Sequence, residues 1–237
     1  MNKMKKRYII LIISILSILA FSIYYVNDYY HADSTALEYL NGSDNVTVQK
    51  TSTGLFIDGP GNETALIFYP GGKVEYTSYL PLMTDIASNG VDCYLVEMPL
   101  NIAFFGINAA DEIINNTNYS SYVIGGHSLG GIAASSYAHE HNVSGLILLA
   151  SYPTEEINVP VLSIYGSNDG VLKLEDYNKS KSLIKGNFTE LIINGGNHAQ
   201  FGNYGIQSGD GIASISSINQ QNQTATAIIN FIFTLNS

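Results

Sequence analysis

Residues 122–131 read Tyr-Val-Ile-Gly-Gly-His-Ser-Leu-Gly-Gly, and this stretch decides the fold. Its apolar start predicts a strand over 122–125, and the Ala- and Ser-rich run after it predicts a helix over 129–140. Between the two lies Gly126-x-Ser128-x-Gly130. A serine at a tight strand-to-helix turn has a strained backbone, and the residues two before and two after it must lack side chains. We therefore predict a nucleophile turn (residues 126–130) that raises Ser128 Oγ above a sheet.

The segments on either side of this turn alternate between short β-branched or aromatic runs and helical patterns. Five of the runs are almost continuously apolar, which is typical of strands covered by helices on both faces. Because two β-rich segments come first, the order predicts an α/β fold with a mostly parallel eight-stranded sheet and an antiparallel start. The expected strands span 46–51, 54–57, 65–69, 91–97, 122–125, 145–150, 161–166 and 190–193, and the expected helices span 76–88, 109–116, 129–140, 174–184 and 224–235.

Composition bounds the class of protein. The chain has 237 residues and a formal charge of −10, and 13% of its residues are charged against roughly 25% in an average soluble domain. With 46% hydrophobic residues the chain is not disordered, and its acidity argues against nucleic acid as a partner. After the first 26 residues six lysines face twenty carboxylates, a formal charge of −14. These residues are enough for one core and leave no room for a second domain.

The first 26 residues predict a membrane anchor. Residues 8–26 carry no charge, and a helix of that length roughly matches the ~30 Å hydrocarbon core of a bilayer. Four cations precede residue 8, so we expect a cytoplasmic basic tip (1–7), a transmembrane anchor (8–26), a tether (27–45) and an extracytoplasmic domain (46–237) of a single-pass protein of the cell membrane. The alternative is a cleaved signal peptide and a secreted protein. Bulky residues follow the run, and His31-Ala32-Asp33 is the one weak late cleavage site.

A candidate acid and a candidate base follow the last two expected strands. Asp169, in Ser167-Asn168-Asp169-Gly170, comes directly after the strand 161–166, where open α/β sheets gather functional groups. His198 follows the strand 190–193 through a Gly-rich loop that lets its imidazole fold back toward Ser128. The base would bond to Ser128 Oγ, with its other nitrogen held by the aspartate. Asp210 is a distant rival for the acid.

Four segments make the chain resemble the α/β-hydrolase superfamily over roughly 46–235, most closely the small bacterial and archaeal proteins of this fold. They are Tyr-Pro-Gly-Gly-Lys-Val-Glu (69–75), Met-Pro-Leu-Asn (98–101), the nucleophile turn and Gly-Gly-Asn-His-Ala-Gln-Phe-Gly (195–202). The resemblance implies the chain order nucleophile, acid, histidine, hence Ser128, Asp169 and His198. It also implies an oxyanion donor after the strand 65–69, the N–H of Gly72 or of Lys73. The Leu129 N–H, at the start of the helix, is expected as the other donor.

The remaining polar residues indicate no metal and no cofactor. His127 is expected to pack beside the nucleophile, and His139 and His141 face apart on one helix. Lys73 is open to three interpretations: contact with an anionic substrate, a solvated side chain, or a pair with Glu75.

The interval 153–161 is too short for a lid, so we expect an open, cap-less site. Five aromatic residues could line an aromatic cleft or pack in the core: Phe104, Phe105, Tyr152, Phe201 and Tyr204. We expect a serine hydrolase with a small-molecule acyl substrate, most simply a carboxylesterase (EC 3.1) and next a thioesterase. An acyltransferase would use the same residues, and a catalytically silent surface binding protein is the interpretation from another class. The oligomeric state is left open.

Overall fold

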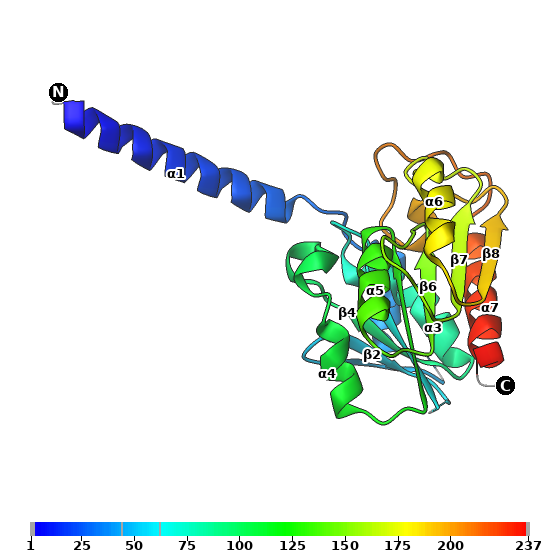
Figure 1. Cartoon of the computed structure of the whole chain (residues 1–237). Coiled ribbons are helices and arrows are strands. Elements are labelled where there is room, and N and C mark those ends of the chain that lie inside the picture. Colours follow the sequence, from blue (N-terminus) through cyan, green and yellow to red (C-terminus); the bar gives the residue numbers. More distant parts are fainter. Residues whose placement is uncertain (1–2, 44, 62, 236–237) are drawn as a thin grey trace.

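The computed structural model describes residues 3–43, 45–61 and 63–235, and its centre is one sheet of eight strands (Figure 1). The strand order is β1-β2-β4-β3-β5-β6-β7-β8. The pairs β1–β2 and β2–β4 are antiparallel, and all the others are parallel. This confirms the predicted mostly parallel sheet with its antiparallel start, and each strand lies within two residues of its expected bounds. The bounds are Thr47–Lys50, Gly54–Asp58, Thr64–Tyr69, Asp92–Val96, Ser121–His127, Gly145–Leu149, Val161–Gly166 and Phe188–Ile193 for β1 to β8.

Helices cover both faces of the sheet and enclose two apolar cores. On one face α4 (Ala109–Asn116) and α5 (Leu129–Glu140) pack over β3, β5 and β6, and on the other α3 (Leu80–Ser88) packs beside α7 (Ser217–Leu235). α4 and α5 have their expected bounds. The expected helix 76–88 begins as a 3-10 turn, 174–184 divides into α6 (Leu174–Ser180) and a 3-10 turn, and α7 begins seven residues before the expected 224.

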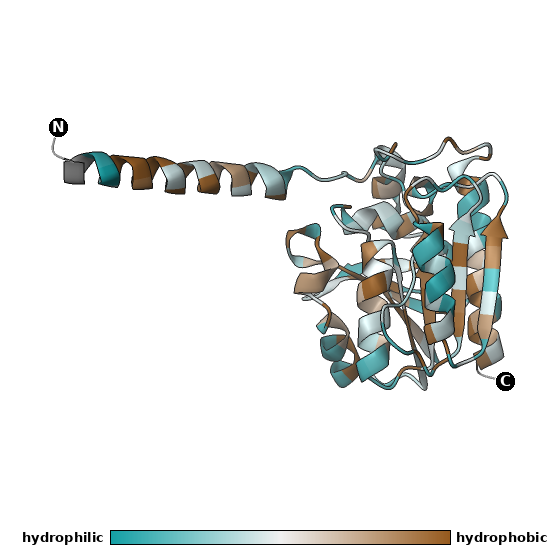
Figure 2. Cartoon of the chain, turned by 45° about the horizontal axis from the view of Figure 1, so that its top comes forward, coloured by the Kyte–Doolittle hydropathy of each residue, from teal (hydrophilic) through white to brown (hydrophobic). Residues whose placement is uncertain are grey.

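The N-terminal helix α1 (Lys3–Asn27) projects away from the domain as a single rod (Figures 1 and 2). Its segment Lys6–Asn27 is long and apolar enough to cross a membrane, and none of that segment's most apolar part is buried. A core helix of a soluble domain would be buried, so α1 has the properties of an anchor or of a signal sequence. Residues 1 and 2 of the expected basic tip lie outside the described residues.

The expected tether, 27–45, packs on the domain over much of its described length. Tyr30 forms a parallel bridge with Val74, and its N–H donates to Lys73 O over 2.7 Å. Asp33 then caps the short helix α2 (Ser34–Glu38), in which Ala36 is fully buried. The chain therefore joins the domain three residues after α1 ends. Residue 44, also part of the expected tether, lies outside the described residues.

The parallel strands all end at the same edge of the sheet, which we call the carboxyl edge. Residues 150–160 connect β6 to β7 and contain no helix or strand segment in the described structure. The sequence predicted that this connection is too short for a lid. It is a loop without secondary structure, so no lid segment from it covers the carboxyl edge beside β6.

Candidate active site

The nucleophile turn forms where β5 ends and α5 begins. Ser128 lies between them with φ 53° and ψ −121°, a left-handed conformation that strains a residue with a side chain. A Cβ on Gly126 would meet the Gly130 carbonyl at 2.5 Å, and one on Gly130 would meet Tyr69 O at 2.3 Å. The steric requirement for glycine two residues before and two after Ser128 is thus met by the packing of the turn.

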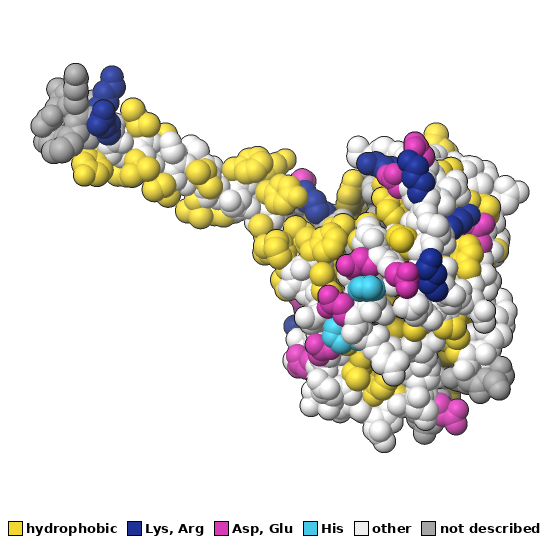
Figure 3. Space-filling model, in the orientation of Figure 1, with side chains coloured by type: hydrophobic (Ala, Val, Ile, Leu, Met, Phe, Trp, Pro, Cys, Tyr) yellow, Lys and Arg dark blue, Asp and Glu magenta, His cyan; other side chains and the backbone are white. Residues whose placement is uncertain are grey.

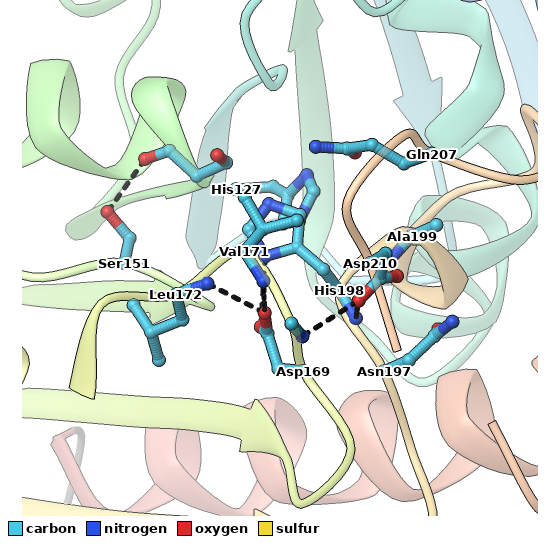
Figure 4. A network of polar contacts seen from close by, with 12 residues as sticks. His127, Ser151, Asp169, Val171, Leu172, Asn197, His198, Ala199, Gln207 and Asp210 are labelled. Carbon is cyan, nitrogen blue, oxygen red and sulfur yellow. Dashed lines mark hydrogen bonds and ion pairs between the residues drawn. The ribbon is translucent and has the colours of Figure 1, made fainter. Parts of the chain in front are cut away.

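Asp169 and His198 face each other across the ends of β7 and β8 (Figure 4). His198 Nδ1 lies 2.9 Å from Asp169 Oδ2, and both side chains are almost completely buried. The other carboxylate oxygen, Oδ1, accepts the N–H groups of Val171 and Leu172 at 2.8 Å each. The carboxylate is therefore fixed by its own turn, and it can hold the imidazole with Nδ1 protonated.

Ser128 and His198 line the same cleft, which has a volume of about 160 Å³. Tyr152 and the exposed Lys173 stand at its wall. His198 Nε2 is buried and has no hydrogen-bond partner among the described residues, and no bond to Ser128 Oγ is formed. Such contacts in a substrate-free site often close only when substrate binds. The free Nε2 is the atom that a base would use.

The loop after β3 carries three candidate backbone N–H donors, those of Gly71, Gly72 and Lys73, and only one of them lacks an acceptor among the described residues. The Lys73 N–H donates to Asn101 O over 2.7 Å, and the Gly71 N–H donates to the Tyr79 hydroxyl over 3.0 Å. The Gly72 N–H has no partner within the described part of the chain. A Cβ on Gly72 would meet Leu129 Cδ2 at 2.8 Å, so this peptide lies directly against the start of α5. The Leu129 N–H is in the first turn of that helix, where N–H groups lack intrahelical acceptors.

Comparison with known proteins identifies the family of this chain. The sequence profile of the alpha/beta hydrolase family matches residues 65–222. The chain belongs to the alpha/beta hydrolase family. Among solved structures it is similar to TT1662 from Thermus thermophilus (TM-score 0.60, 12% identity) and to Est1E from Butyrivibrio proteoclasticus (TM-score 0.55, 12% identity). Each similarity covers 81% of this chain and 99% of the other, and at this identity it shows the fold alone. No curated protein sequence matches significantly.

In this alpha/beta hydrolase His127 is a structural neighbour of the pair. It is fully buried, its ring centre lies 4.5 Å from that of His198, and its Nδ1 lies 2.7 Å from the Tyr79 hydroxyl. Burial lowers the pKa of His127 well below its usual range, and the neighbouring His198 lowers it further. Burial raises the pKa of Tyr79, so the phenol keeps its proton and its O–H donates a hydrogen bond to Nδ1 of a neutral His127. The expectation that His127 packs beside the nucleophile is met.

For two sets of the hydrolase's side chains the sequence left alternatives open, and the structure decides between them. Lys73 pairs with Asp28, 2.8 Å away, and not with Glu75. Of the five aromatic residues only Tyr152 lines the cleft. Phe201 and Tyr204 are buried in the core behind His127, and Phe104 and Phe105 are exposed away from the cleft. The cleft is therefore not aromatic.

The remaining histidines of the hydrolase bond to unrelated partners. His139 Nδ1 lies 2.8 Å from Glu156 O, and His141 stacks on Tyr137 with ring centres 4.0 Å apart. His31 lies 3.4 Å from Glu75. The described residues contain no group of three or more His, Cys, Asp or Glu side chains placed to hold a metal ion.

Sequence reasoning missed the part that Asp210 plays. Its carboxylate accepts four backbone N–H groups, those of Gly170, His198, Ala199 and Gly211, over 2.7–3.2 Å. Asp210 therefore links the loop of the candidate acid to the loop of the candidate base, while Asp169 is the carboxylate that contacts the His198 ring. The isolated Gly-Asp-Gly at 209–211 is the only signal in the sequence, and it fits any turn.

Ser151 is the second residue missed. Its Oγ donates to Ser128 O over 2.7 Å, which supports the strained turn from the end of β6 (Figure 4).

Proposed function

We propose that this alpha/beta hydrolase is a membrane-anchored serine hydrolase that cleaves an ester-like bond outside the cytoplasm. The observation that carries the proposal is the buried Asp169–His198 pair: His198 lines the same cleft as the strained Ser128, and its Nε2 has no hydrogen-bond partner among the described residues. A buried imidazole held by a carboxylate at one nitrogen and unpaired at the other is arranged to take a proton from a neighbouring hydroxyl.

The proposed reaction has two halves. Ser128 Oγ attacks the carbonyl carbon while its proton passes to His198 Nε2, and the C–O bond to the leaving alcohol breaks as that alcohol takes the proton. Water then gives a proton to Nε2 and attacks the acyl carbon. The bond from that carbon to Ser128 Oγ breaks, and Oγ takes the proton from Nε2 as the acid is released. The negative oxygen formed in each half would lie between the N–H groups of Gly72 and Leu129. We assign the first donor to Gly72 because the Lys73 N–H is already bonded to Asn101.

The anchor is proposed from α1. Its candidate span of 22 residues is about 33 Å long as a helix, close to the hydrocarbon thickness of a bilayer. Figure 3 shows apolar side chains along the helix and Lys and Arg side chains at its far end. Since cations near a span stay in the cytoplasm, the domain would lie outside. The mass of the membrane-associated protein distinguishes an anchor from a cleaved signal, and added protease tests the orientation.

Labelling with a fluorophosphonate tests the chemistry. We expect the wild type to be labelled, and Ser128→Ala and His198→Ala to lose the label. Ser135→Ala is the matched control, because Ser135 is a fully buried serine of α5 whose Oγ bonds, among the described residues, only to Ile132 O. Labelling that persists in Ser128→Ala would overturn the nucleophile. An unlabelled wild type would favour a catalytically silent binding protein. Two further assays separate the alternatives from ester hydrolysis. Cleavage of a thioester substrate would indicate a thioesterase, and transfer of the acyl group to an added alcohol would indicate an acyltransferase.

A further inference from the structure

The end of α1 is bonded to the loop that holds the candidate oxyanion donor. Lys73 O accepts the Tyr30 N–H over 2.7 Å, and Tyr30 O accepts the Glu75 N–H over 2.9 Å. Lys73 Nζ lies 2.8 Å from Asp28 and 4.5 Å from the centre of the Tyr25 ring. Only two residues separate Asn27 from Tyr30, so the helix end stays within about 10 Å of this loop whatever the tilt of α1.

An apolar hollow of about 290 Å³ lies at this junction. One wall comes from α1, through Phe21, Tyr25 and Val26, and the facing wall comes from the loop after β4, through Leu100 and Phe105. Lys73 also lines the hollow. The hollow therefore lies between the part of α1 nearest the domain and Lys73, the residue that follows the candidate donor Gly72 in the chain.

The wall from the domain is apolar although it faces outward. Leu100 is 51% exposed and Phe105 is 62% exposed, and Leu100 is held outward by a left-handed backbone with φ 56°. The Lys73–Asn101 backbone bond ties this loop to the one after β3. Exposed apolar groups in a continuous patch mark an interaction surface, and here the patch continues into α1 (Figure 3).

This junction points to a bilayer as the occupant. If α1 spans the membrane, Phe21 and Tyr25 lie in its outer layer, and Leu100 and Phe105 lie at the same depth. Tyr25 lies among several tyrosines around the helix end, a composition typical of the membrane–water interface. Lys73, which lines the hollow, can reach lipid headgroups, as lysines near a span do.

We propose that the substrate is an ester-linked acyl lipid of the bilayer, whose chain lies in the hollow between α1 and the loop 100–105. This inference rests on the proposed function. The chain would move from the membrane into the hollow without crossing water, and its ester carbonyl would lie beside Gly72 at the mouth of the Ser128 cleft.

The first test measures contact with lipid independently of activity. The chain contains no Trp, so Phe105→Trp gives the full-length protein a single tryptophan, whose emission can be excited apart from that of the tyrosines. In vesicles of phosphatidylcholine with brominated acyl chains, we expect this fluorescence to be quenched. Phe233→Trp is the control, because Phe233 is 53% exposed on α7, away from the hollow. Equal and weak quenching at both positions would overturn the proposal, and so would burial of the hollow by a second copy of the chain.

The second test compares two esters with the same leaving group. The full-length protein in phosphatidylcholine vesicles is assayed with 4-methylumbelliferyl oleate, which partitions into lipid, and with the water-soluble butyrate. We expect the double variant Leu100→Ser, Phe105→Ser to lower the oleate-to-butyrate rate ratio by about tenfold, and Phe233→Ser to leave the ratio unchanged. An unchanged ratio in the double variant overturns the inference while the proposed function stands. Failure of the proposed function is distinct, because the wild type would then cleave neither ester and take no fluorophosphonate label.

Discussion

Replacing Tyr79 with phenylalanine tests whether the loop after β3 and the nucleophile turn act as one unit. The Tyr79 hydroxyl accepts the Gly71 N–H over 3.0 Å and donates to His127 Nδ1 over 2.7 Å. Among the described residues it is the only side chain that hydrogen-bonds to both segments. Phenylalanine fills the same space in the core, so the change removes two hydrogen bonds and leaves no large cavity.

The cost follows from the burial of both partners. Gly71 and His127 are buried, and each unsatisfied buried polar group costs about 1–3 kcal/mol, so we expect a loss of about 2–4 kcal/mol in the free energy of unfolding after some relaxation. Freed from Tyr79, Gly71 would let the Gly72 peptide move. Loss of an oxyanion donor costs about 10²–10³ in kcat, so a loosened donor should cost about 10–100-fold.

Urea unfolding and ester hydrolysis measure the two effects separately. Tyr137→Phe is the matched control, because Tyr137 is equally buried and its hydroxyl donates to Asp111, far from the cleft. We expect Tyr137→Phe to lose about 1 kcal/mol of stability and no activity. A Tyr79→Phe protein with the expected stability loss but full kcat would refute the link to the donor loop. A stability loss no larger than that of the control would refute the two hydrogen bonds.

Three further predictions concern the carboxylates and His127. Asp169→Asn should lower kcat about 10⁴-fold, because the amide favours the wrong tautomer of His198, and activity near that of the wild type would contradict the assignment of the acid. Asp210→Asn removes acceptors from the N–H groups of Gly170 and His198, so urea unfolding should show a free energy of unfolding lower by about 2–4 kcal/mol. We also expect a fall in kcat that is larger than any change in KM. An unchanged kcat would show that Asp210 does not position the base. The pKa of folded His127 lies below the unfolded value of about 6.5, so the unfolded chain binds the extra proton and stability falls by about 1.4 kcal/mol per pH unit as pH drops below 6.5. Urea unfolding at pH 7.5 and 5.5 should show a smaller loss for His127→Gln than for the wild type, and equal losses would contradict it.

The strand set could be predicted from sequence because each strand is a short apolar run between turn residues. The nucleophile turn could be predicted because only glycine fits at these positions for local steric reasons: a Cβ added to Gly126 would lie 2.5 Å from the Gly130 carbonyl. Both features depend on residues close together in the chain.

Features that depend on distant contacts could not be predicted. α7 begins at Ser217 although its first turns are rich in Asn and Gln, because Gln220 is fully buried and bonds to both the N–H and the C=O of Asn197, beside His198. A helical pattern of apolar residues starts only later in the segment, at about Thr224. The packing of Tyr30 on the loop after β3 is a contact across 44 residues, and a polar segment gives no sign of it.

Backbone strain gives a separate reason to place the chemistry at the carboxyl edge. Five non-glycine residues in the described chain have a positive φ: Lys73, Leu100, Asn101, Ser128 and Ala150. They follow β3, β4, β5 and β6, so all five lie where strands end around one cleft and one hollow. Each such residue costs on the order of 1–3 kcal/mol, which a fold keeps only where the surrounding contacts enforce it. A purely structural sheet could avoid that cost with glycines, as the chain does at Gly195 and Gly209. The strain at Lys73 and Leu100 sets the donor loop and the hollow in place together, which is the coupling that a lipid substrate would need.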